Sequence, residues 1–210
     1  MAISYTYWNP NLIADYNIAM RGIIHIGAHY GQEYADYIKY GMRDIIFIEP
    51  LIANYTKLLE LTPKDAGIKT FNMALGNTTG TIDMFVETAN SGMSSSILEP
   101  GTHLETYPFI TFDTKETVKI DKLDNIEFDR SLYNVLNIDV QGYELEVLKG
   151  SEDTLKYIDA IFTEINVGEV YKGCGKLEDL DAFLIPRGYK RAFTNIYDKI
   201  LYGDAIYVKQ

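Results

Sequence analysis

The chain has 210 residues, 47% of them hydrophobic and 23% charged, which suits one well-buried globular domain spanning residues 1–210. The formal net charge of −11 argues against a nucleic-acid partner, because a nucleic-acid surface needs clustered cations. The single cysteine, Cys174, excludes an intramolecular disulfide framework and a multi-thiolate metal site.

Two further classes of segment are missing from the sequence. No apolar run approaches the ~20 residues of a membrane span, so no membrane partner is expected. The first eight residues lack the basic start and apolar core of a secretory signal, which predicts a cytoplasmic location. The sequence does not indicate an oligomeric state.

In the first third of the chain, apolar runs alternate with helix-like stretches. Residues 1–21 are predicted to be an N-terminal extension or leading helix, with the helix at 11–20. Three strands and two helices follow, namely a strand at 22–27, a helix at 31–40, a strand at 44–48, a helix at 51–61 and a strand at 68–74.

The rest of the chain begins with a less regular part. A strand at 81–86, a small polar loop at 90–96 and an extended piece at 118–120 are expected. Regular alternation then resumes, with strands at 133–139 and 159–164 and helices at 143–149 and 176–186. The last two strands, 189–193 and 204–208, have no helical pattern between them, which favours an antiparallel hairpin. The prediction is an α/β fold around a mostly parallel seven-stranded sheet with helices on both faces.

The first strand-helix-strand unit carries the clearest functional signal. Gly27 and Gly31 follow the first strand, and Glu49 ends the second strand 18 residues later, near the ~20 expected for a ribose-binding carboxylate. The full G-x-G-x-x-G pattern is missing, so a nucleoside without phosphates, such as S-adenosylmethionine, fits better than a dinucleotide. A plain tight turn is the alternative.

Several other polar residues stand where ligands bind α/β sheets. Asp139 and Glu164 end apolar strands, although Asp139 is also a plausible helix cap and Glu164 a solvated strand end. His25 and His29 straddle a strand end, so the helical two-histidine metal geometry does not apply. Either a hydrogen-bonding role or an unliganded structural role suits them.

At these residues the chain resembles the FkbM family of S-adenosylmethionine-dependent methyltransferases, over about residues 22–208. The motif at 25–31 is similar to the family's D-x-G-A-N-x-G, and 47–50 to its A-x-E-P. Ala74-Leu75-Gly76 and the serines at 94–96 match the segments that follow. Most specific is the segment 138–150, which is very close to the family's I-D-V-Q-G-x-E-x-x-V-L-x-G.

Two residues depart from the family pattern. The family's leading acid, which commonly orients the methionine end of the cofactor, is His25 here, and its usual Asn is His29. The methionine end is therefore expected to be held differently, or by Glu144 and backbone groups. Because an acid is usual at this position, His25→Asp is expected to be tolerated.

The resemblance implies a Rossmann-like class I methyltransferase that methylates an oxygen of a sugar or other small polar acceptor. It implies catalytic roles for Asp139, Glu164 or His29. The implied cofactor-binding residues are His25, Gly27, Ala28, Tyr30, Gly31, Glu49, Pro50, Ala74, Leu75, Asp139, Gln141 and Glu144.

Three alternatives stay open. A magnesium ion held by Asp139, Glu164 and Asn166 is possible, although no metal is the preferred reading. A binding module without catalysis and an NAD-dependent nucleotide-sugar enzyme are the rival functions.

Overall fold

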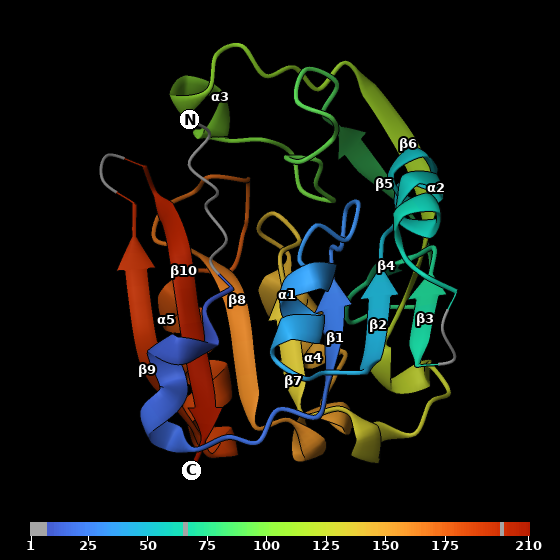
Figure 1. Cartoon of the computed structure of the whole chain (residues 1–210). Coiled ribbons are helices and arrows are strands. Elements are labelled where there is room, and N and C mark those ends of the chain that lie inside the picture. The colour runs from blue at the N-terminus through green and yellow to red at the C-terminus, as the bar shows by residue number, and fades with distance from the viewer. Residues whose placement is uncertain (1–7, 65–66, 198–199) are drawn as a thin grey trace.

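A computed structural model describes residues 8–64, 67–197 and 200–210 (Figure 1). Its centre is a seven-stranded sheet in the order β3-β2-β1-β7-β8-β10-β9. The strands are β1 (Gly22–Ile26), β2 (Asp44–Ile48), β3 (Ile68–Phe71), β7 (Val135–Ile138), β8 (Ala160–Asn166), β9 (Tyr189–Ile196) and β10 (Tyr202–Lys209). β10 is antiparallel to β8 and β9, whereas β3, β2, β1, β7 and β8 pair in parallel. The predicted sheet and its C-terminal antiparallel hairpin are confirmed.

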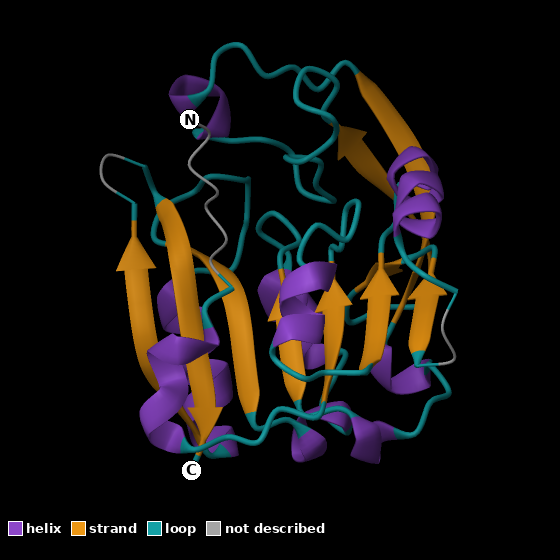
Figure 2. Ribbon diagram, viewed as in Figure 1, coloured by secondary structure: helices purple, strands orange, loops and turns teal. Residues whose placement is uncertain are grey.

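Helices cover both faces of this sheet (Figure 2). The helices are α1 (Tyr34–Lys39), α2 (Ile52–Leu61), α3 (His103–Thr106), α4 (Glu144–Lys149) and α5 (Leu177–Leu184), with 3-10 turns at Pro10–Tyr16, Leu123–Asn125, Arg130–Leu132, Thr154–Tyr157 and Ile185–Arg187. The short helix α3 lies beyond the strand ends and not on a face of the sheet (Figure 1). In the described part of the chain, every helix is too short or too polar to cross a membrane.

Side-chain alternation along β1 explains the two layers. Ile23 faces a core that includes residues of α1 and α2, whereas Ile24 faces a core that includes residues of α4 and α5. Both isoleucines are fully buried, as expected for a central strand of a parallel sheet with two covered faces. His25 is on the same side as Ile23, so its ring lies toward Tyr37 of α1.

Most predicted boundaries differ from the structure by a few residues, and two predicted elements differ in kind. The leading helix is a 3-10 turn at Pro10–Tyr16 that ends where Asn17 adopts a left-handed backbone; the part of that prediction at 1–7 lies outside the described residues. The strand expected at 68–74 is divided into β3 and β4 (Ala74–Leu75). Between them the Asn72 amide donates to the carbonyls of Glu49 and Pro50, and these bonds tie the chain to the end of β2.

A second, three-stranded sheet was not anticipated. β4, β6 (Thr114–Asp121) and β5 (Gly80–Val86) form it, in that order. Its apolar side packs Leu51, Met84 and Ile120 together. The expected strand at 81–86 is one member, and the extended piece at 118–120 is part of a longer one. This sheet places β4 and the loop after β5 beside the ends of β1 and β2 (Figure 1).

Candidate active site

The loops after β1, β2 and β7 meet at one edge of the main sheet. The amides of Gly27 and Ala28 donate to the Ile48 carbonyl at 2.9 and 3.0 Å, and the Asp139 amide donates to the Ile26 carbonyl at 3.0 Å. Gly27 has a φ of +82°, and a Cβ there would lie 1.7 Å from the Asp139 carbonyl oxygen. Only glycine therefore allows the first and third loops to approach this closely.

Backbone strain is concentrated at the same place. Among the described residues other than glycine, four have a positive φ, and three of these are His29, Ser91 and Gln141. His29 and Ser91 contact each other, since His29 Nε2 is 2.9 Å from the Ser91 carbonyl oxygen. Strained positions persist where the surrounding structure enforces them, and they are frequent at functional sites.

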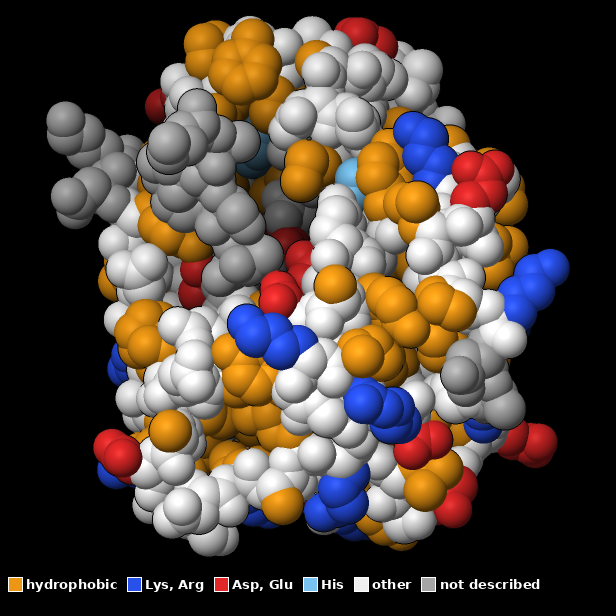
Figure 3. Space-filling model, viewed as in Figure 1, with side chains coloured by type: hydrophobic (Ala, Val, Ile, Leu, Met, Phe, Trp, Pro, Cys, Tyr) orange, Lys and Arg blue, Asp and Glu red, His pale blue; other side chains and the backbone are white. Residues whose placement is uncertain are grey.

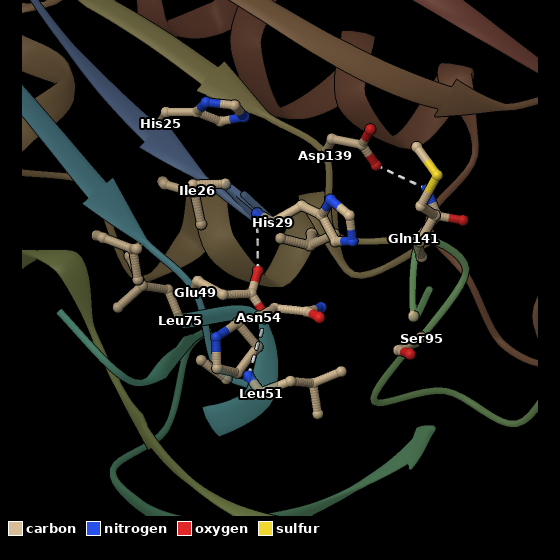
Figure 4. Close-up of a pocket in the computed structure, with 18 of the residues that line it drawn as sticks. His25, Ile26, His29, Glu49, Leu51, Asn54, Leu75, Ser95, Asp139 and Gln141 are labelled. Atoms are coloured by element: carbon tan, nitrogen blue, oxygen red, sulfur yellow. Dashed lines mark hydrogen bonds between the residues drawn. The ribbon is translucent and has the colours of Figure 1, made fainter. Parts of the chain in front are cut away.

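Glu49 is held firmly beside the first loop (Figure 4). The amide of His29 donates to its Oε2, and that of Leu51 to its Oε1, both at 2.9 Å. Burial raises the pKa of Glu49 to about 7 despite these hydrogen bonds, which lower it. The Asn54 side chain also hydrogen-bonds this carboxylate. A carboxylate has about four acceptor positions, so the side chain can still accept a hydroxyl group of a ligand.

A narrow cleft runs along these loops, and most of the predicted cofactor residues line it. They are His25, Gly27, Ala28, Glu49, Pro50, Ala74, Leu75, Asp139 and Gln141, and the predicted catalytic residue His29 joins them. The structure thus brings together predicted residues from four separate segments of the chain. The lining also includes Ser95, from the serine loop matched to the family, and Asn54, Met84 and Ile97, which sequence reasoning did not single out.

Three predicted cofactor residues lie outside the cleft lining. Gly31 packs against α2, since a Cβ there would lie 2.7 Å from Leu58 Cδ1. The Tyr30 hydroxyl accepts a hydrogen bond from Lys57 Nζ at 2.9 Å. Glu144 is 1% exposed, and its Oε1 accepts the amides of Val140 and Gly142. These residues shape the loops, and the structure gives Glu144 no access to a ligand.

A second cavity of about 690 Å³ adjoins the cleft. Glu33, Met93, Asp139 and Gln141 line both spaces. The rest of the second lining combines carboxylates with aromatic and apolar side chains, among them Glu164, Asp204, His103, Tyr107, Tyr197 and Tyr202. In Figure 3, acidic side chains gather at a hollow in the middle of the viewed face.

The carboxylates of the second cavity influence one another. Burial, reinforced by Asp139, Glu144 and Asp204, raises the pKa of Glu164 well above its usual value. Burial also raises the pKa of Asp139, and it raises that of Asp204 to about 7. Burial and mutual repulsion therefore make each of these carboxylates a stronger base than a solvent-exposed one, which suits groups that accept a proton during a reaction.

Gln141 joins two of these acids. Its Nε2 donates to Asp139 Oδ1 at 2.7 Å and to Glu164 Oε2 at 3.1 Å, and its Oε1 accepts from the Tyr171 hydroxyl at 2.7 Å. An amide NH2 between two carboxylates occupies the position that a cation would need. The oxygen and nitrogen of the Asn166 side chain are buried without a hydrogen-bond partner. The described residues contain no cluster of three or more His, Cys, Asp or Glu suited to a metal, so this arrangement does not fit the possible magnesium site.

The two histidines have different surroundings. Burial lowers the pKa of His25 to about 3, so the ring is neutral, and its Nδ1 lies 3.1 Å from the Tyr37 hydroxyl. Asn137 Nδ2 donates to that hydroxyl at 2.6 Å, which leaves the hydroxyl proton for His25. Burial lowers the pKa of His29 as well. The Gln32 amide lies 2.7 Å from His29 Nδ1, so both ring nitrogens of His29 have protein partners.

Sequence reasoning also missed Glu33, Tyr171 and Asp204. Glu33 directly precedes α1, and an acid at the start of a helix is already explained by its favourable interaction with the helix dipole. Asp204 was recognised only as the start of a strand, and its register opposite Glu164 is a tertiary feature. Cys174 is buried and its Sγ lies 3.4 Å from the Gly168 carbonyl oxygen, away from both linings.

Comparisons with known proteins agree with this geometry. A curated relative from Sinorhizobium fredii, called 2-O-methyltransferase NoeI, is 29% identical over 113 residues, which are 50% of this chain and 46% of that protein. The crystal structure of methyltransferase FkbM from Methylobacillus flagellatus matches 90% of this chain and 44% of its own, at 16% identity and a TM-score of 0.61. The chain thus spans less than half the length of these two proteins.

A further solved structure shows the fold without close sequence similarity. The magnesium protoporphyrin IX methyltransferase of Synechocystis, solved with S-adenosylmethionine bound, covers 95% of this chain and 74% of its own at 10% identity and a TM-score of 0.53. The family model described as the methyltransferase FkbM domain matches residues 25–191, which include the loops after β1, β2 and β7. This chain therefore belongs to the FkbM methyltransferase family.

Proposed function

We propose that this chain transfers a methyl group from S-adenosylmethionine to an oxygen of a sugar or another small, neutral polar acceptor. The observation that carries the proposal is the pair of adjoining cavities that share Asp139 and Gln141. Methyl transfer needs a donor and an acceptor aligned across one junction, and two cavities with a common wall provide that arrangement.

The narrow cleft is the proposed cofactor site. Glu49 would accept a ribose hydroxyl at an acceptor position that its protein partners leave free. Ala74 and Leu75 offer an apolar flank for the adenine, and the loop at Gly27 allows close approach of the methionine part. The bound cofactor in the Synechocystis protein of the same fold supports this choice of ligand.

Asp139 and Glu164 are the proposed proton acceptors. The acceptor hydroxyl oxygen forms a bond to the methyl carbon while the carbon–sulfur bond breaks, and the electron pair of that bond stays on sulfur. The hydroxyl proton passes to a carboxylate, and the raised pKa of these acids favours that step. His29 is less suited to this role, because its ring nitrogens contact Gln32 and Ser91.

The wider cavity indicates the chemistry of the acceptor. Carboxylates accept hydroxyl groups, and the faces of Tyr197 and Tyr202 suit the apolar face of a sugar ring. Among the described residues, no lysine or arginine lines this cavity, which disfavours an anionic acceptor. The name of the Sinorhizobium relative, a 2-O-methyltransferase, supports transfer to oxygen.

Binding calorimetry followed by a methylation assay tests the proposal. S-adenosylhomocysteine is expected to bind and NAD is not. Radiolabelled S-adenosylmethionine should then label one or more neutral sugars in a panel, but not the corresponding sugar phosphates, and Asp139→Asn should abolish labelling. Binding of NAD with no binding of S-adenosylhomocysteine would refute the proposal. Cofactor binding without methylation of any acceptor would favour a binding module.

A further inference from the structure

Glu33 is a partly buried acid, and one of its carboxylate oxygens has no hydrogen-bond partner. It lies directly before α1, its Oε2 is buried without a hydrogen bond, and its side chain lines both the cleft and the wider cavity. A buried polar atom without a partner carries a free-energy penalty. An unpaired carboxylate oxygen at a cavity wall therefore points to a ligand that pairs with it.

Among the described residues, no lysine or arginine forms an ion pair with this carboxylate. The basic group recorded within 4 Å of Glu33 is His25, whose Nδ1 lies 3.8 Å from Oε2. That distance is too long for a hydrogen bond. The ring is also held neutral by burial, and its Nδ1 already lies 3.1 Å from the Tyr37 hydroxyl. Neither charge nor a hydrogen bond from His25 satisfies Glu33.

The neighbouring acid strengthens the negative character of this wall. Asp139 also lines both cavities, and its charge contributes to raising the pKa of Glu33 to about 7, after burial. The methionine part of S-adenosylmethionine carries two positive groups, the α-ammonium and the sulfonium. A wall with two carboxylates thus faces a cofactor with two cations.

We propose that Glu33 binds the α-ammonium group of the cofactor and so replaces the acid missing at position 25. This assignment rests on the proposed function. His25 and Glu33 are adjacent in space although eight residues apart in sequence, so the carboxylate enters the same region from α1. Glu144, which the sequence suggested for this end, is fully engaged with the amides of its own loop.

Two ligands that differ only at the methionine end separate this role from a structural one. S-adenosylhomocysteine has the α-ammonium, whereas 5′-methylthioadenosine has the same adenosine and a thioether but no amino-acid part. Glu33→Gln preserves the shape of the side chain and removes its charge. Calorimetry is expected to show a Kd for S-adenosylhomocysteine that is about 10- to 100-fold higher, with the Kd for 5′-methylthioadenosine unchanged. Glu60→Gln, on the exposed surface of α2, should change neither.

The other outcomes are informative. Equal weakening of both ligands, or no weakening of either, would overturn the assignment. Unchanged affinity for S-adenosylhomocysteine with slower methylation would place Glu33 on the acceptor and likewise overturn it. If the unmodified protein bound neither ligand, the proposed function itself would fail, and the assignment with it.

A charge exchange provides a second test. The structure changes the expectation for His25→Asp, because the new carboxylate would lie close to Glu33 and repel it. The single variant is therefore expected to bind S-adenosylhomocysteine more weakly. The double variant His25→Asp with Glu33→Gln restores one carboxylate at this place and should recover most of the affinity. Circular dichroism confirms that each variant is folded. A double variant as weak as Glu33→Gln alone would contradict the exchange.

Discussion

Replacing Glu49 by Gln should remove a pH dependence of folding stability that this carboxyl group imposes. Burial raises the pKa of Glu49 from 4.5 to about 7 in the folded chain. Between these two values the folded state holds a proton that the unfolded state has released. The free energy of unfolding therefore falls as the pH rises through this window. At ~1.36 kcal/mol per pKa unit, the loss attributable to Glu49 is about 3 kcal/mol.

Urea unfolding of the ligand-free protein at pH 4.5 and pH 8 measures this effect. Glu33, Glu144 and Asp204 also have pKa values raised to about 7, so the informative quantity is the difference between unmodified protein and variant. Between pH 4.5 and pH 8, the free energy of unfolding should decrease in both proteins. The decrease in Glu49→Gln is expected to be smaller than that in the unmodified protein by about 3 kcal/mol. The exposed variant Glu60→Gln should behave like the unmodified protein. Equal pH dependence of all three proteins would refute the reasoning.

Three further predictions concern packing around the site. Gly27→Ala should prevent stable folding, because the new Cβ would meet the Asp139 carbonyl oxygen. The matched variant Gly41→Ala has a φ of +90° but no atom within 4 Å of its new Cβ, so it should lower the free energy of unfolding, measured in urea, by only ~1–2 kcal/mol. Tyr171→Phe removes the hydroxyl whose single proton is shared between the Ser94 carbonyl oxygen and Gln141 Oε1, and should lower the free energy of unfolding by ~1–3 kcal/mol; an unchanged value would exclude this hydroxyl as a structural link. Burial raises the pKa of Cys174, so iodoacetamide should label the native chain far more slowly than the urea-unfolded chain, and similar rates would contradict its burial.

The sheet was predictable where local pattern alone decides the structure. The strand Asp44–Ile48 has four consecutive apolar residues after its first position, and its predicted boundaries match the structure. The prediction of one strand over 68–74 was wrong because the Asn72 side chain donates hydrogen bonds to the carbonyls of Glu49 and Pro50 after β2. Hydrophobic periodicity gives no indication of such a contact. The three-stranded sheet was missed because β5 and β6 pair across a long connection between residues 86 and 114.

The candidate site shows the same division. Glu49 and Asp139 follow their own strands, so the rule that ligands bind at strand ends was enough to find them. Glu164 was expected at a strand end, but β8 continues to Asn166 and Glu164 lies opposite Asp204 within the antiparallel pair. Glu33 and Asp204 reach the cavities only through the packing of α1 and the insertion of β10. The residues next to Glu33 and Asp204 in sequence do not indicate that either side chain lines a cavity.

The position of β10 has a consequence for the order in which the molecule forms. β10 inserts between β8 and β9, both of which precede it in the chain, and it delivers Asp204 to the wider cavity. The narrow cleft draws on β1, β2 and the loop after β7, none of which pairs with β10. Pairing between distant segments is slow, because loop closure must precede the contacts that stabilise it. β10 pairs with β9 and β8, which lie near it in sequence, whereas β1 pairs with β7 across all the residues between Ile26 and Val135. A folding chain can therefore form the wall that carries Asp204 while the nucleoside cleft is still open. Hydrogen exchange during refolding would register this as protection of β10 before β1.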